Sequence, residues 1–182
     1  MISNTKQKKQ KFSRIFEVKE LVLVGVILVF WIAMSFVAVN FKNPSNIIAI
    51  FLGLSTEAII AIGMANLLIS GGLDLSVGST LALGGVVSCL CMKAGLSVPI
   101  SIIFGILTGS IIGFVNGTII VRWRINPLIV TLGMQTVVRG FTLILAGGTA
   151  IVGLPESFAL IGKGKIFGIQ YPIIITTALV IV

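Results

Sequence analysis

Long apolar runs constrain the fold of this chain more than any other feature. The first run, Leu21–Val39, has nineteen residues without a charge. A helix rises about 1.5 Å per residue, so a run of this length can cross the roughly 30 Å hydrocarbon core of a membrane. Because lipid offers no hydrogen-bond partners to the backbone, such runs are expected to be helical. The sequence therefore predicts an all-α, polytopic helical membrane protein with about five to six transmembrane helices.

The predicted spans follow one another through the chain. Residues 1–20 are expected to form a basic cytoplasmic tail, and residues 21–182 a transmembrane domain. The first run is longer than the roughly 7–15 residues of a signal-peptide core, so we expect an uncleaved anchor. The last run holds about half a span, so we expect the domain to be incomplete at its C-terminus. The expected spans are Leu21–Val39, Ile47–Ile69, Leu75–Met92, Ile100–Val121, Pro127–Ala146 and a short run that opens at Pro172.

Composition supports a membrane protein and argues against a nucleic-acid partner. Only 10% of the residues are charged, against about 25% in soluble domains. The net charge is +8, but a basic tail beside a span usually sets topology. Six of the thirteen basic residues precede the first apolar run, namely Lys6, Lys8, Lys9, Lys11, Arg14 and Lys19. With this tail in the cytoplasm, successive spans return Arg122 and Arg124 to the cytoplasm, in agreement with the positive-inside rule.

The segment Ser70–Ser79, SGGLDLSVGS, is unusual in so apolar a chain. Glycine disfavours helix interiors, and an acid at membrane depth costs about 2.5–3.5 kcal/mol on insertion scales. Broken helices with polar residues are typical of transporters. We therefore expect Asp74 or Ser76 to cap the following helix, either alone or together with a hinge that moves during transport. The residues expected to form this break or hinge are Gly71, Gly72, Asp74, Ser76 and Gly78.

Several polar residues interrupt the predicted spans. Charges inside a membrane usually pair, and counting along the helices puts Glu57 about 15 Å from the outer end of its span and Arg139 about 18 Å from the inner end. We therefore predict a Glu57–Arg139 pair, with Asp74 toward the cytoplasmic edge. Alternatively, Arg139 caps carbonyls at a helix break and Glu57 faces the pore. The candidates for a translocation path are Glu57, Asn66, Asn116, Gln135 and Arg139.

A stripe of small residues marks the fourth span. Small residues four apart let two helices approach closely in lipid, either within a subunit or between subunits. The chain contains no His, and Cys89 and Cys91 point to different sides of a helix, so no metal site is expected. The residues of the stripe are Gly105, Gly109, Gly113 and Gly117.

Three blocks of sequence resemble a known family. Ala61–Met64 precedes SGGLDLSVGS, and Pro127–Gly133 precedes Arg139 and Gly140. A third block runs from Gly153 to Pro172. In this order, from about Asn40 onward, they resemble permease subunits of bacterial ribose-type sugar ABC importers. Ala65 and Leu73 depart from the residues common in that family, which leaves the identity of the sugar open.

The resemblance implies a function and a set of partners. It implies a dimeric permease core in the cytoplasmic membrane, formed with an identical or a related second permease subunit. Two cytoplasmic ATPase subunits would bind ATP and magnesium, and an extracytoplasmic binding protein would deliver a ribose-like monosaccharide. The permease itself would be no enzyme and would hold no cofactor. Residues 147–171 are then a candidate docking surface for the binding protein.

Two alternatives remain open from the residues. A branched-chain amino-acid permease has a distantly similar sequence. A membrane scaffold subunit without a transport path is the other, although the polar residues within the spans argue against it.

Overall fold

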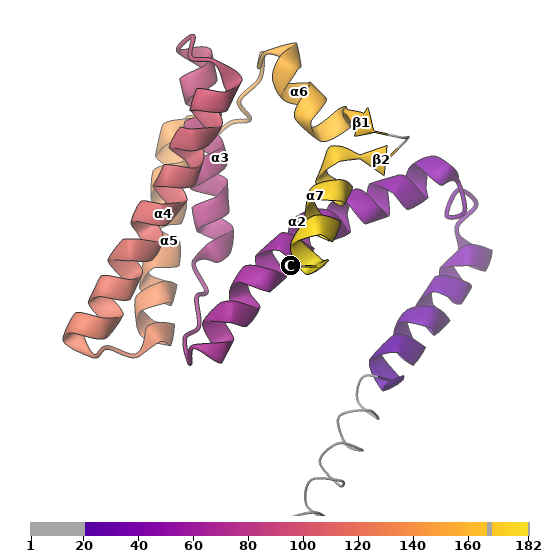
Figure 1. Cartoon of the computed structure of the whole chain (residues 1–182), viewed down its shortest axis with the longest axis horizontal. Coiled ribbons are helices and arrows are strands. Elements are labelled where there is room, and N and C mark those ends of the chain that lie inside the picture. The colour runs from indigo at the N-terminus through magenta and orange to yellow at the C-terminus, as the bar shows by residue number, and fades with distance from the viewer. Residues whose placement is uncertain (1–20, 167–168, 182) are drawn as a thin grey trace, which may run out of the picture. The chain divides into compact units, whose positions relative to one another are not determined.

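The computed structural model describes residues 21–166 and 169–181, so the predicted tail at residues 1–20 lies outside the described residues. It confirms an all-α membrane protein with several apolar helices (Figure 1). Within these described residues, three helices are long and apolar enough to cross a membrane, namely α2 (Pro44–Ile69), α4 (Val98–Trp123) and α5 (Pro127–Ala146). Shorter elements are the helix Leu21–Val37, α3 (Val77–Lys93), α6 (Glu156–Lys163), strands β1 (Lys165–Ile166) and β2 (Ile169–Gln170), and α7 (Tyr171–Ile181).

The chain divides into two compact units, Met1–Phe51 and Leu52–Val182. In the described part of the first unit, the rings of Trp31 and Phe41 meet edge to face at 5.8 Å between centroids. The side-chain oxygen of Asn43 accepts hydrogen bonds from the Ser45 backbone N–H at 3.1 Å and from its hydroxyl at 2.7 Å. This arrangement starts α2 at Pro44, three residues before the predicted start, because proline suits the first turn of a helix.

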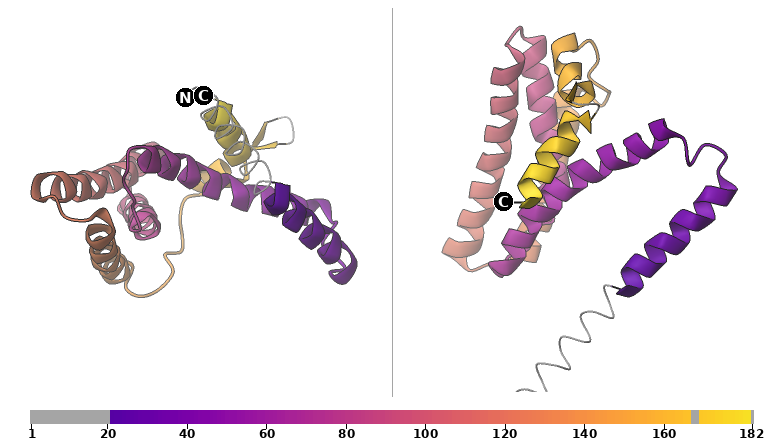
Figure 2. Two further views of the ribbon diagram at one scale, coloured as in Figure 1. Left: turned by 90° about the horizontal axis from the view of Figure 1, so that it is seen from below. Right: turned by 45° about the vertical axis from the view of Figure 1, so that its right-hand side comes forward.

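In the second unit, α3 packs along both α4 and α5 (Figure 1). Helices α3 and α5 begin at the same end of this bundle and α4 runs the opposite way, as the further views also show (Figure 2). The buried core consists of Leu83 from α3, Ile112 from α4 and Val138 from α5, with Val87 and Met134 packed against it. This small apolar core is the frame that positions the polar residues described below.

Two glycines let α3 and α4 approach closely. A Cβ atom added to Gly84 would lie 2.9 Å from the carbonyl oxygen of Gly105, and one added to Gly105 would lie 2.7 Å from that of Gly84. A Cβ atom at Gly105 would also collide with the hydroxyl of Ser88, which donates a hydrogen bond to the Gly84 carbonyl at 2.9 Å. Backbone contact of this kind is what small residues permit in membrane helices.

The other glycines of the stripe do not take part in this close contact between α3 and α4. A Cβ atom at Gly109 would lie 3.6 Å from the Thr80 methyl group, which is ordinary packing distance. At Gly113 and Gly117 nothing in the described structure lies within 4 Å. The stripe therefore packs inside this chain at one end and is open at the other.

The predicted helix break is present, and its first half is a glycine-capped helix end. Gly71 has φ of 79°. Its N–H donates to the Leu68 carbonyl at 3.0 Å, and the Gly72 N–H donates to the Leu67 carbonyl at 2.9 Å. This pair of bonds is a Schellman motif, which ends α2 at Ile69. The chain is then non-helical until α3 begins at Val77.

The predicted connection at residues 147–171 contains short elements of its own. It holds α6 and a two-residue hairpin in which Lys165 pairs with Gln170. Gly164 lies against the Tyr171 ring, where the hairpin joins α7. The Thr176 hydroxyl donates to the Ser55 carbonyl at 3.0 Å, so α7 is hydrogen-bonded to α2.

Candidate functional site

A chain of hydrogen bonds joins the helix break to α4. One carboxylate oxygen of Asp74 accepts the Ser76 N–H at 2.7 Å and the Ser76 hydroxyl at 2.6 Å. The Asn116 side-chain amide in turn donates to the Ser76 hydroxyl oxygen at 3.0 Å. Ser76 has no exposed surface and Asn116 is 3% exposed, so this is a buried polar link between two helices. It ties the start of α3 to one point on α4.

The capping prediction needs a correction. Ser76 is the residue that precedes α3, but its side chain makes no hydrogen bond to the first turn. Its backbone angles, φ −82° and ψ −7°, are already helical, whereas a capping side chain usually extends from β-region backbone. Asp74 does not cap the first turn either, because its described bonds go to Ser76. The acid instead closes a local turn that presents Ser76 to Asn116.

The start of α3 lies inside the bundle. Asn116 precedes the end of α4 at Trp123 by seven residues, which is about 10 Å of helix. Its bond to Ser76 therefore holds the first residues of α3 about 10 Å in from that end, not level with it. Helix α3 has 17 residues, about 25 Å, which is less than the thickness of a hydrocarbon core.

An open groove lies between the start of α3 and the middle of α5, and we call it the α3/α5 groove. Its volume is about 830 Å³, within the size range of ligand pockets. Gln135 and Arg139 of α5 line it together with Gly78 of α3, so the fold brings together three of the predicted site residues. The remaining lining residues are Ser79, Leu132, Thr136, Gly140 and Leu143.

The predicted Glu57–Arg139 pair is wrong for this structure. Among the described residues no ion pair joins the two side chains, and both are exposed. Counting residues along each span gave Glu57 and Arg139 similar depths in the membrane. Two residues at the same depth can still lie on helices that are not neighbours. Helix α5, which carries Arg139, packs against α3 and α4. Glu57 lies on α2, outside that bundle.

Two other polar residues of the spans lie apart from the groove. The Asn66 side chain is exposed on α2, and its backbone carbonyl accepts the Ser70 hydroxyl at 2.9 Å. The Thr118 hydroxyl donates to the Phe114 carbonyl of its own helix at 2.7 Å. Neither residue is brought into contact with Gln135 or Arg139.

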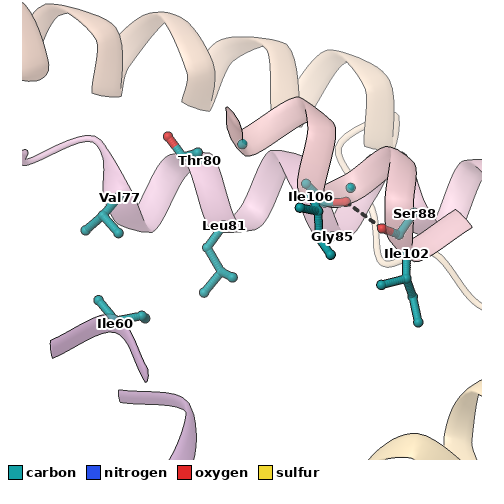
Figure 3. Close-up of a pocket in the computed structure, with 11 residues that line it drawn as sticks. Ile60, Val77, Thr80, Leu81, Gly85, Ser88, Ile102 and Ile106 are labelled. Atoms are coloured by element: carbon teal, nitrogen blue, oxygen red, sulfur yellow. Dashed lines mark hydrogen bonds between the residues drawn. The ribbon is translucent and has the colours of Figure 1, made fainter. Parts of the chain in front are cut away.

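A second pocket, of about 350 Å³, lies over the glycine contact of α3 and α4. Figure 3 shows Thr80, Leu81 and Gly85 of α3 and Ile106 of α4 around it, with Ile60 of α2 opposite. Its lining is mostly apolar and carries no charged side chain. Because a site for a polar ligand needs converging polar groups, the α3/α5 groove is the better candidate.

Sequence reasoning missed Ser79 as a site residue. It lies in the predicted break segment and is 6% exposed, and its position in the groove comes from the first turn of α3. Its place three residues after Ser76 was a usable signal, because residues three apart lie on neighbouring parts of one helix face.

The comparisons with known proteins decide the family. The profile of the family described as "Branched-chain amino acid transport system / permease component" matches residues 46–182. The chain belongs to this permease family. It is therefore a multi-pass membrane protein of a family of transport permeases, and its apolar helices also indicate a membrane protein.

Several curated relatives that resemble this chain are sugar permeases by name. The L-arabinose ABC transporter permease AraH of Azospirillum brasilense is 42% identical over 83% of this chain and 44% of its own length. The ribose import permease RbsC of Bacillus subtilis is 33% identical over 93% of this chain and 53% of its own. The D-allose permease AlsC of Escherichia coli is 33% identical over 74% of this chain and 41% of its own length. The chain thus spans about half the length of the relatives it matches, and no solved structure matches it.

Proposed function

We propose that this chain is a permease subunit of an ATP-binding-cassette importer that carries a monosaccharide across the bacterial cytoplasmic membrane. The observation that carries the proposal is the similarity to permeases for arabinose, ribose and allose, which are all small neutral sugars. The α3/α5 groove supports it, because a charged, an amide and a hydroxyl side chain line one open space beside a broken helix.

The proposed subunit works with partners. A second permease subunit completes the translocation path, and two cytoplasmic ATPase subunits bind ATP and magnesium, so this chain needs neither catalysis nor a cofactor. An extracytoplasmic sugar-binding protein docks on the segment with α6 and the β1–β2 hairpin. The exposed apolar side chains of the helices face lipid or the second subunit.

Branched-chain amino acids are the second candidate substrate. The description of the family names them, whereas the individual relatives are named for sugars. We favour a sugar because the individual relatives are 33–42% identical to most of this chain, while the description covers a broad family.

Uptake measurements separate the two substrates. Deletion of the gene for this chain in its source cells should abolish ATP-dependent uptake of at least one labelled monosaccharide among arabinose, ribose and allose. Leucine uptake, measured in the same cells, should be unchanged. Loss of leucine uptake with intact sugar uptake would contradict the proposal, and reintroduction of the gene is the control.

A further inference from the structure

The α3/α5 groove contains a combination of side chains suited to a particular ligand chemistry. The Arg139 guanidinium only donates hydrogen bonds, while the Gln135 amide both donates and accepts. The Leu132 and Leu143 side chains supply apolar surface beside them. A hydroxyl-rich molecule with apolar C–H faces meets all three kinds of group.

Ser79 adds a hydroxyl donor and acceptor to the lining of the groove. The residue is 6% exposed and lines the groove, yet its hydroxyl has no hydrogen-bond partner among the described residues. Other helical serines behave differently: the Ser88 hydroxyl donates to the Gly84 carbonyl and the Ser110 hydroxyl to the Ile106 carbonyl. The Ser79 hydroxyl is not among the fully buried side-chain oxygens, so it is accessible to a group that enters the groove.

The positive charge near the groove is partly offset by a carboxylate. The start of a helix carries a partial positive charge, and Arg139 adds a full one. The Asp74 carboxylate, bonded to Ser76 directly before α3, lies at that same helix end and offsets its partial charge. The carboxylate thus reduces the positive potential at this end of α3, which lowers the advantage that an anion would have over a neutral polyol.

We infer that the start of α3 and the middle of α5 form a weak subsite for a neutral monosaccharide, with Ser79, Gln135 and Arg139 as its hydrogen-bonding groups. The inference rests on the proposed function and adds the place where the sugar is held. An open groove with a few polar groups binds loosely, and loose binding suits a path from which the sugar must also leave.

Protection from a thiol reagent tests the subsite. Ser79→Cys is introduced into the complete transport system after Cys89 and Cys91 are replaced by alanine. The sugar whose uptake depends on this gene should slow the reaction of that thiol with a small maleimide at least about twofold in membranes. Ser110→Cys on α4, outside the groove, is the matched control and should show no protection. Gln135→Cys is a second reporter in case the first variant does not accumulate.

Transport by conservative variants gives the second readout. Loss of one hydrogen bond is worth about 0.5–1.5 kcal/mol, so Ser79→Ala should change the relative uptake of two sugars roughly two- to tenfold. Ser110→Ala should leave the ratio unchanged. A purely structural effect of the substitution would lower the uptake of both sugars by the same factor.

The outcomes distinguish the subsite from the proposed function. Sugar uptake that depends on the gene, without protection at either groove position and with an unchanged sugar ratio, would overturn the subsite alone. Absence of any gene-dependent sugar uptake would overturn the proposed function as well. Protection by an anionic sugar acid but not by the neutral sugar would contradict the assignment of ligand class.

Discussion

At the residue scale, Gly105 and Gly113 lie on the same stripe of α4, yet only Gly105 contacts α3 closely. Gly105→Ala should therefore lower the free energy of unfolding by about 1–3 kcal/mol, because the new methyl group collides with Ser88 and the Gly84 backbone. Denaturation of the purified protein in detergent measures this. Gly113→Ala, with open space around it, is the matched control and should not lower the free energy of unfolding, because alanine favours a helix interior more than glycine does. Equal effects of the two substitutions would contradict the α3–α4 contact.

The Ser76–Asn116 bond is a second residue-scale feature, and a double-mutant cycle tests it. Ser76→Ala and Asn116→Ala should show a coupling energy of about 0.6 kcal/mol and at most about 1.7, as for other hydrogen bonds between membrane helices. Thr118→Val on the same helix, whose hydroxyl bonds to its own backbone, should not couple with Ser76→Ala. A coupling energy of zero for the first pair would show that α4 does not hold the break.

Residue types were predictable from the sequence, but their partners were not. The polar residues Asn116, Gln135 and Arg139 stand out in apolar spans, and the fold places two of them in one groove. The partner of Asn116 depends on which helix packs beside α4 and at what height. The Glu57–Arg139 prediction failed for the same reason, since a count along single helices carries no information about neighbours.

At the scale of elements, the end of α2 depends on one glycine. Gly71 has a positive φ that side-chain-bearing residues adopt at a cost of about 1–2 kcal/mol. Gly71→Ala should therefore destabilise the protein by about that amount, as measured by thermal denaturation in detergent. Gly63→Ala, inside the same helix with open space around it, should not destabilise the protein, because alanine favours a helix interior more than glycine does. Unchanged stability of the Gly71 variant would contradict the Schellman motif.

Element boundaries were predictable where strong local signals mark them. Helix α5 has the predicted bounds, Pro127–Ala146, because proline opens it and Gly147 with φ of 65° closes it. The Asn126 side chain also accepts the Leu128 N–H at 2.9 Å. Helix α6 was not predicted, because an eight-residue helix within a glycine-rich connection gives no long apolar period.

At the scale of the whole molecule, the proposed orientation places the α4–α5 connection in the cytoplasm and the α3–α4 connection outside. In a variant with Cys89 and Cys91 replaced by alanine, Leu96→Cys should react with a membrane-impermeant maleimide in intact cells. Ile125→Cys should react only after permeabilisation. The reverse pattern would show that the N-terminus is outside.

The central structural claim is that α3 begins inside the bundle, beside the middle of α5 and not beside its start. Cysteine crosslinking tests it most directly, because Leu128 and Gln135 lie on the same face of α5, seven residues or about 10 Å apart. In the background without Cys89 and Cys91, we predict that a short bismaleimide joins Ser79→Cys to Gln135→Cys and leaves the pair Ser79→Cys and Leu128→Cys unjoined. Efficient crosslinking to Leu128→Cys, without crosslinking to Gln135→Cys, would contradict the account.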